Sequence, residues 1–198
     1  MGEGLAKRLY EGVKKAYSSA AERPTEQHPF PVGKAFAESL GYPKELLETL
    51  PAYSVDAFAG VSNVSIYAEI PAGSTILDLG CGAGLDTLIV AHRTGPTGQV
   101  IGIDFSNSML DRARRAAQEA GIGNIEFRES PAECLPLKNG EIDVAIVNGI
   151  FNLNPHREDI FSELFRVVRR DGHVYAAELI LIESITDSSP PTEADWFA

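Results

Sequence analysis

Five short apolar runs, separated by helical patterns, constrain the fold of this chain more than any other feature. The runs predict strands at residues 75–80, 99–105, 125–129, 142–149 and 173–182. Amphipathic patterns predict helices near 86–93, 106–120 and 156–168. Such alternation is typical of a mostly parallel sheet with helices on both faces, and right-handed crossovers make it a doubly wound, Rossmann-like α/β fold.

The first 70 residues have a different pattern, and we assign them to an N-terminal helical extension or lid. Leu9, Val13 and Tyr17 recur at helical spacing and predict an amphipathic helix that lies on the domain. Three prolines between residues 23 and 33 predict an ordered loop, and short helices are expected near 34–40 and 43–50. The predicted domains are therefore 1–70 for the extension and 71–198 for the α/β domain.

Composition limits the partners and the location. The formal net charge of −11 argues against nucleic acid as a partner, because phosphate contacts need a concentrated positive patch. Two cysteines are too few for a disulfide framework, and the N-terminus shows no signal peptide. No run approaches the roughly 18 apolar residues of a membrane span. We expect a cytoplasmic protein that binds neither nucleic acid nor membranes.

The turn after the first predicted strand, LDLGCGAG, predicts a ligand site. Gly80, Gly82 and Gly84 allow a tight turn and a close approach of the backbone to a ligand. Their spacing differs from the GxGxxG dinucleotide fingerprint, and Asp78 would repel a pyrophosphate but favour an ammonium group. Asp104, at the end of the second strand, is placed to accept hydrogen bonds from two ribose hydroxyls. The pattern favours a nucleoside that carries an amino acid over a nicotinamide dinucleotide.

Five segments in this order resemble the class I S-adenosylmethionine-dependent methyltransferases. They read LDLGCGAG, VIGIDFSNSML, SPAECLPL, DVAIVNGIFNL and LFRVVRRDGHV. The resemblance implies strand order 3-2-1-4-5, S-adenosyl-L-methionine as cofactor, and methyl transfer to a small-molecule acceptor. The cofactor-binding residues that it implies are Asp78, Gly80, Cys81, Gly82, Gly84, Asp104, Phe105, Met109, Ala132, Glu133 and Asn148.

The resemblance also implies how these residues divide the cofactor among them. Asp78 and the glycine turn frame the methionine part, and Asp104 holds the ribose. Phe105 and Met109 flank the adenine. Ala132 and Glu133 contact the edge of the adenine that carries its amino group. Pro131 occupies the position before Ala132 where the family usually has an aspartate. Asn148 lies under the transferable methyl group and near the ammonium.

No residue of the sequence is an unambiguous catalytic base, and the candidate catalytic residues are Asn148, Asn152 and His156. His156 is as readily interpreted as a helix cap or a surface residue. The aromatic residues Tyr10, Tyr17, Tyr53 and Phe58 either line an acceptor pocket or pack in the core. The absence of a base favours a soft or already activated acceptor.

The upstream segment and the motif NLNP resemble the arsenite methyltransferase branch, whose members hold trivalent arsenic by cysteine thiolates. Two of those cysteines align with Val61 and Gly149, which offer no thiolate. Cys81 and Cys134 stand at other motif positions and are interpreted as small packed residues. We therefore expect no metal site and an acceptor other than arsenite.

Two other functions stay open: a non-catalytic or truncated cofactor-binding protein, and an NAD-dependent oxidoreductase, which Asp78 disfavours. After Ile182 only sixteen residues remain, with prolines at 190 and 191, so we expect the final hairpin strands of the family fold to be missing. The open edge of the fifth strand would then be covered by the N-terminal segment or by a second copy of the chain in a homodimer.

Overall fold

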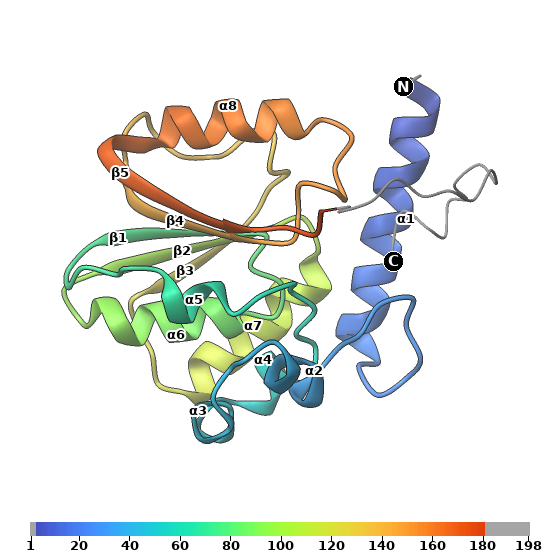
Figure 1. Cartoon of the computed structure of the whole chain (residues 1–198), viewed down its shortest axis with the longest axis horizontal. Helices are drawn as coiled ribbons and strands as arrows, with labels where there is room; N and C mark the ends of the chain where they lie inside the picture. Colours follow the sequence, from blue (N-terminus) through green and yellow to red (C-terminus); the bar gives the residue numbers. More distant parts are fainter. Residues whose placement is uncertain (1–2, 181–198) are drawn as a thin grey trace.

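The computed structural model describes residues 3–180, and a five-stranded sheet forms their core (Figure 1). The strands are β1 (Thr75–Leu79), β2 (Gln99–Asp104), β3 (Ile125–Glu129), β4 (Ile142–Asn148) and β5 (Val168–Ala177). They lie in the order β3-β2-β1-β4-β5, and all four neighbouring pairs are parallel. The predicted doubly wound fold is confirmed.

Helices cover both faces of this sheet. Along the chain they are α1 (Glu3–Glu22), α2 (Lys34–Ser39), α3 (Lys44–Thr49), α4 (Ala52–Val55), α5 (Val64–Tyr67), α6 (Leu85–Thr94), α7 (Asn107–Glu119) and α8 (Arg157–Val167). Figure 1 shows α6 and α7 on one side of the sheet and α8 on the other. The sequence did not predict α4 and α5, because one helical turn is too short to show a 3.6-residue period.

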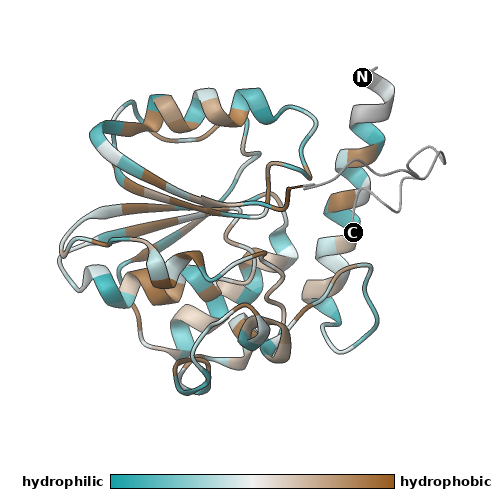
Figure 2. Cartoon of the chain, in the orientation of Figure 1, coloured by the Kyte–Doolittle hydropathy of each residue, from teal (hydrophilic) through white to brown (hydrophobic). Residues whose placement is uncertain are grey.

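The three central strands, β1, β2 and β4, are apolar on both faces, as a sheet with two helical layers requires. Ile76 and Leu77 are both fully buried, and because successive strand residues point to opposite faces they join different clusters. Leu77 packs in the cluster that contains Ile160 of α8, and Ile76 in the one that contains Val90 of α6. Figure 2 shows hydrophobic residues along the central strands and in α6.

The fifth strand begins five residues earlier than predicted. Arg169, Arg170 and Asp171 are exposed and polar, so no apolar run marks this part of the strand. Asp171 has a left-handed backbone (φ 64°), and the pairing of β4 with β5 shifts register beside it, between Ile142 and Val144. The predicted strand therefore missed the irregular start and was placed too late.

Within residues 3–180, β5 pairs with β4 alone and forms one edge of the sheet. The segment in which we expect the final hairpin strands to be missing, 183–198, lies outside the described residues. The homodimer expected through this edge stays a prediction. No helix of the described part of the chain combines the length and the apolar character needed to cross a membrane.

Helix α1 stands beside the carboxyl ends of the strands and packs on the start of α7 (Figure 1). Ala20 and Ala21 are buried in a cluster with Met109 of α7. The Ser18 hydroxyl lies 2.9 Å from the Ser106 hydroxyl, and Arg112 donates to the carbonyl of Ala21 at 3.1 Å. The N-terminal helix is thus held against the edge of the sheet where β1, β2 and β4 end.

Candidate functional site

A cavity that is partly open to solvent lies at the carboxyl ends of β1, β2 and β4. The strand order reverses between β1 and β4, and such a reversal is where open α/β sheets bind ligands. The walls of the cavity include α1, the loop at 57–60, the turn at 79–83 and the segment at 148–154. Segments that are far apart in the sequence therefore share one site.

The glycine turn after β1 forms the floor of this cavity. Gly82 has φ +52°, and no atom lies within 4 Å of the position that its Cβ would occupy, so the space above it is open to a ligand. Gly84 does not line the cavity: it precedes α6 with φ +86°, and a Cβ there would lie 3.0 Å from the Ala113 Cβ. Cys81 lines the cavity and is 7% exposed, and burial raises the pKa of its thiol well above the usual value.

Asp104 joins this turn to the start of α7. Its Oδ2 accepts a hydrogen bond from the Gly82 amide at 2.9 Å, and its Oδ1 accepts one from the Ser106 amide at 2.8 Å. The side chain lines the cavity, and burial raises the pKa of its carboxyl to about 6 against the opposing effect of these amides. The carboxylate retains acceptor capacity for a ligand hydroxyl.

Asp78 lies beneath the floor and does not line the cavity. It is 2% exposed, and its Oδ2 accepts a hydrogen bond from the Thr87 hydroxyl of α6 at 2.5 Å. Burial, followed by the neighbouring charge of Asp86, raises its pKa well above the usual value. The structure thus gives Asp78 a contact that positions α6, and its expected contact with an ammonium group stays a prediction.

Asp86, in the first turn of α6, is the acidic lining residue of the cavity that the sequence analysis missed. Its carboxylate accepts hydrogen bonds from the hydroxyls of Tyr42, at 2.6 Å, and Ser65, and from Asn148 Nδ2 at 2.9 Å. Burial raises its pKa, and the donors from Ser65, Tyr42 and Asn148 oppose this shift. The one sequence signal was a carboxylate two residues after the glycine turn, where a helix start alone explains it.

Asn148 connects β4, α6 and the loop before α5. Its Oδ1 accepts hydrogen bonds from the amides of Val61 and Ser62 at 2.9 and 3.1 Å. Its Nδ2 donates to the Ser62 carbonyl at 2.7 Å and to Asp86 Oδ2 at 2.9 Å. A Cβ on Gly60 would lie 2.5 Å from this Nδ2. The side-chain amide therefore has its full set of hydrogen bonds and fixes the wall of the cavity.

The cavity is also lined by Phe105, Met109, Ala132 and Glu133. Oε1 of Glu133 accepts a hydrogen bond from Asn154 Nδ2 at 2.8 Å. Oε2 is buried and has no hydrogen-bond partner within residues 3–180. A buried acceptor without a partner is costly, so a ligand that donates a hydrogen bond here is favoured.

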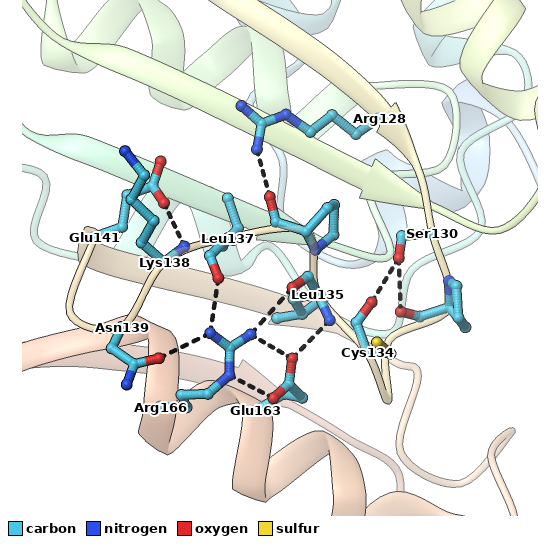
Figure 3. Close-up of polar contacts among 12 residues, drawn as sticks. Arg128, Ser130, Cys134, Leu135, Leu137, Lys138, Asn139, Glu141, Glu163 and Arg166 are labelled. Carbon is cyan, nitrogen blue, oxygen red and sulfur yellow. Dashed lines mark hydrogen bonds and ion pairs between the residues drawn. The ribbon is translucent and has the colours of Figure 1, made fainter.

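The loop that follows Glu133 is held in place by polar contacts to Leu135 and Leu137 (Figure 3). The guanidinium of Arg166 in α8 donates to the carbonyls of Leu137, at 2.7 Å, and Leu135, at 3.0 Å. It also pairs with Glu163 at 2.6 Å, and Glu163 accepts from the Leu135 amide at the same distance. One arginine thus fixes the backbone that presents Glu133 to the cavity.

The structure does not bring all of the predicted site residues together. The predicted residues that line the cavity are Gly80, Cys81, Gly82, Asp104, Phe105, Met109, Ala132, Glu133 and Asn148. Those that lie outside its lining are Asp78, Gly84, Asn152 and His156. Asn152 is exposed and donates to the Leu179 carbonyl at 2.6 Å. His156 is exposed at the N-cap position of α8, but its side chain makes no capping hydrogen bond, in agreement with its interpretation as a surface residue.

The aromatic residues also divide between the cavity and other sites. Tyr10, Tyr17 and Phe58 line the cavity, together with Val13 of α1. Tyr53 lies elsewhere, with the guanidinium of Arg112 at 5.6 Å from its ring centre. The helix α1 therefore covers one side of the cavity with aromatic side chains.

The positions that we align with arsenic-binding cysteines, Val61 and Gly149, lie against each other. A Cβ on Gly149 would be 2.9 Å from Val61 Cγ1. Neither residue carries a thiol, and Cys134 is exposed outside the cavity. Within residues 3–180, no group of three or more His, Cys, Asp or Glu side chains is arranged to hold a metal ion.

The described charged side chains that line the cavity are all acidic. Asp86, Asp104 and Glu133 line it, and none of its described lining residues is a lysine, arginine or histidine. A pyrophosphate would meet carboxylates here without a cation to neutralise it, whereas a positively charged ligand is favoured.

Comparison with known proteins agrees with this class of site. A family model described as a methyltransferase domain matches residues 70–197. The chain belongs to this methyltransferase family, and its parallel five-stranded sheet is that of the class I S-adenosylmethionine-dependent enzymes.

Individual relatives differ in their acceptors. An arsenite methyltransferase of Halobacterium salinarum is 33% identical over 144 residues, which are 73% of this chain and 37% of that protein. A demethylmenaquinone methyltransferase of Lactococcus lactis is 38% identical over 106 residues, 54% of this chain and 42% of that protein. The crystal structure of an arsenic(III) S-adenosylmethionine methyltransferase from Chlamydomonas reinhardtii has a TM-score of 0.54 and 28% identity, covering 74% of this chain and 48% of that chain. This chain matches less than half the length of each.

Proposed function

We propose that this protein transfers the methyl group of S-adenosylmethionine to a small-molecule acceptor. The observation that carries the proposal is the acid-lined cavity at the carboxyl ends of β1, β2 and β4. Its features match the parts of this cofactor: open space above Gly82, lone pairs on Asp104 for hydroxyls, and the unpartnered Glu133 oxygen for an amino group. The expected cytoplasmic location is part of the proposal.

When bound, the cofactor supplies an electrophilic methyl group on a positively charged sulfur. The residues of the chain orient the reactants and exclude water. Asp104 binds the ribose, the rigid wall around Asn148 limits where the acceptor can lie, and the aromatic side chains of α1 cover the cavity. Burial raises the pKa of both Tyr10 and Tyr17, so these phenols stay protonated and do not act as bases.

The acceptor that suits this cavity reacts without a strong base. Asp86 and Asn148 are engaged by hydrogen bonds, and no described lining residue is a histidine or lysine. Val61 and Gly149 provide no thiolates for trivalent arsenic, so arsenite is not the acceptor that we propose. A soft or already activated acceptor, such as a thiolate or an electron-rich carbon, fits these conditions.

A methyl-transfer assay with labelled cofactor tests the proposal. The acceptor panel contains thiols, phenols, hydroquinones, amines and arsenite. We expect label in a thiol or hydroquinone product and none in arsenite. Cofactor binding without transfer to any acceptor would instead support the non-catalytic alternative, and binding of NAD in place of S-adenosylmethionine would support the oxidoreductase.

A further inference from the structure

The buried carboxylate of Asp86 is a charge that the implied cofactor contacts do not use. Asp86 lines the cavity, is 6% exposed, and all three of its hydrogen-bond partners, Tyr42, Ser65 and Asn148, are neutral. We propose that Asp86 selects the cationic cofactor S-adenosylmethionine over its product S-adenosylhomocysteine, which lacks the sulfonium charge. This inference rests on the proposed function.

The location of Asp86 follows from its contact with Asn148. Asn148 stands at the end of β4, and the family resemblance puts the transferable methyl group above it. Asp86 Oδ2 lies 2.9 Å from Asn148 Nδ2, so the carboxylate borders the same part of the cavity. A negative charge at this place attracts a sulfonium and has no matching partner once the methyl group has left.

The hydrogen bonds show which of two neighbouring acids keeps its charge. Asp86 accepts three side-chain hydrogen bonds, whereas Asp78 accepts one, from Thr87. Hydrogen-bond donors stabilise the ionised form of a carboxyl group. Two neighbouring buried acids favour sharing one proton, so Asp78 holds the proton and Asp86 keeps the negative charge. Arg93 is engaged elsewhere, because its guanidinium donates to the carbonyls of Ser65 and Ile66.

The test compares three ligands on the full chain by calorimetry: S-adenosylmethionine, S-adenosylhomocysteine, and sinefungin, an analogue with an amine in place of the methylated sulfur centre. The variant is Asp86→Asn. The matched control is Asp111→Asn, an exposed aspartate of α7 outside the cavity. We expect Asp86→Asn to weaken S-adenosylmethionine and sinefungin about tenfold relative to S-adenosylhomocysteine, which corresponds to about 1.4 kcal/mol. The control should leave all three affinities unchanged.

Equal weakening of all three ligands by Asp86→Asn would overturn the inference, because it would show a structural role alone. If this variant does not fold, Asp86→Ser, whose hydroxyl is also neutral and polar, should give the same relative change. In the unaltered protein, the same charge predicts tighter binding of sinefungin than of S-adenosylhomocysteine, and the reverse order would also contradict it. Failure of the unaltered protein to bind any of the three would instead overturn the proposed function.

Discussion

A glycine in the turn after β1 can serve two purposes: it adopts a left-handed backbone, and it leaves space for a ligand. Gly82 and Gly121 both have left-handed backbones, with φ +52° and +65°, and no atoms lie near either Cβ position. They differ in place, because Gly82 lines the cavity and Gly121 follows α7. This pair separates the backbone role of a glycine from its role in the site.

Substitution of each glycine by alanine should therefore have the same effect on stability and different effects on binding. We expect Gly82→Ala and Gly121→Ala each to lower the free energy of unfolding by about 1 kcal/mol, the strain of an L-residue in this region. Only Gly82→Ala should weaken S-adenosylhomocysteine binding, by at least about tenfold. Thermal unfolding measures the effect on stability, and calorimetry measures the effect on binding. Unchanged binding by Gly82→Ala would contradict the placement of the ligand above Gly82.

The raised pKa of Asp104 makes ligand binding depend on pH. Its ordinary value of 3.8 rises to about 6 in the folded protein, so ionisation lowers the stability of the free protein as the pH rises from about 4 to 6. The ionised form accepts hydrogen bonds from the ribose, so affinity for S-adenosylhomocysteine, which lacks the sulfonium charge that Asp86 attracts, should rise through pH 6 and level off near pH 7. Titrations between about pH 5 and 8 measure this, with Asp104→Asn expected to remove the dependence. A flat profile for the unaltered protein would contradict this role.

Among the structural elements, α1 covers the cavity although it precedes the alternating strands and helices of the α/β domain. Tyr10, Val13 and Tyr17 face the cavity, and Lys14 lies 3.7 Å from Glu129 at the end of β3. The Tyr17 ring also stacks on Phe30 at 4.4 Å, which joins α1 to the loop that follows it. A ligand in the cavity should therefore hold α1 in place.

Hydrogen exchange measures this coupling. We expect S-adenosylhomocysteine to slow amide exchange in α1 several-fold, because opening of the helix would then break its contacts with the bound ligand. Helix α8, whose residues do not line the cavity, is the internal control and should change little. Equal exchange in α1 with and without ligand would show that the helix does not close the site.

The elements that the sequence predicted well are those with strong local patterns. The strands β1 to β4 matched their predicted ranges to within one residue at either end, because β1, β2 and β4 are apolar runs and β3 alternates apolar and charged residues. The start of β5 is polar and was missed. In the site, the glycine turn and Asp104 could be found from local spacing. The Asp86 network could not, because Tyr42 and Ser65 meet it from segments more than 20 residues away.

For the whole molecule, charge and topology lead to the same conclusion. The reversal of strand order places the cavity, and the acids that line it without a described cation make it suitable for a positively charged nucleoside. The same features disfavour a dinucleotide, whose pyrophosphate is negative. Binding of S-adenosylmethionine is thus the central claim.

Calorimetric titration of the full chain with S-adenosylmethionine and S-adenosylhomocysteine tests this claim most directly, with NAD added as competitor. We expect one ligand per chain, a dissociation constant below about 1 mM, which corresponds to about −4 kcal/mol, and no displacement by NAD. Absence of binding at millimolar ligand, or displacement by NAD at a comparable concentration, would contradict it.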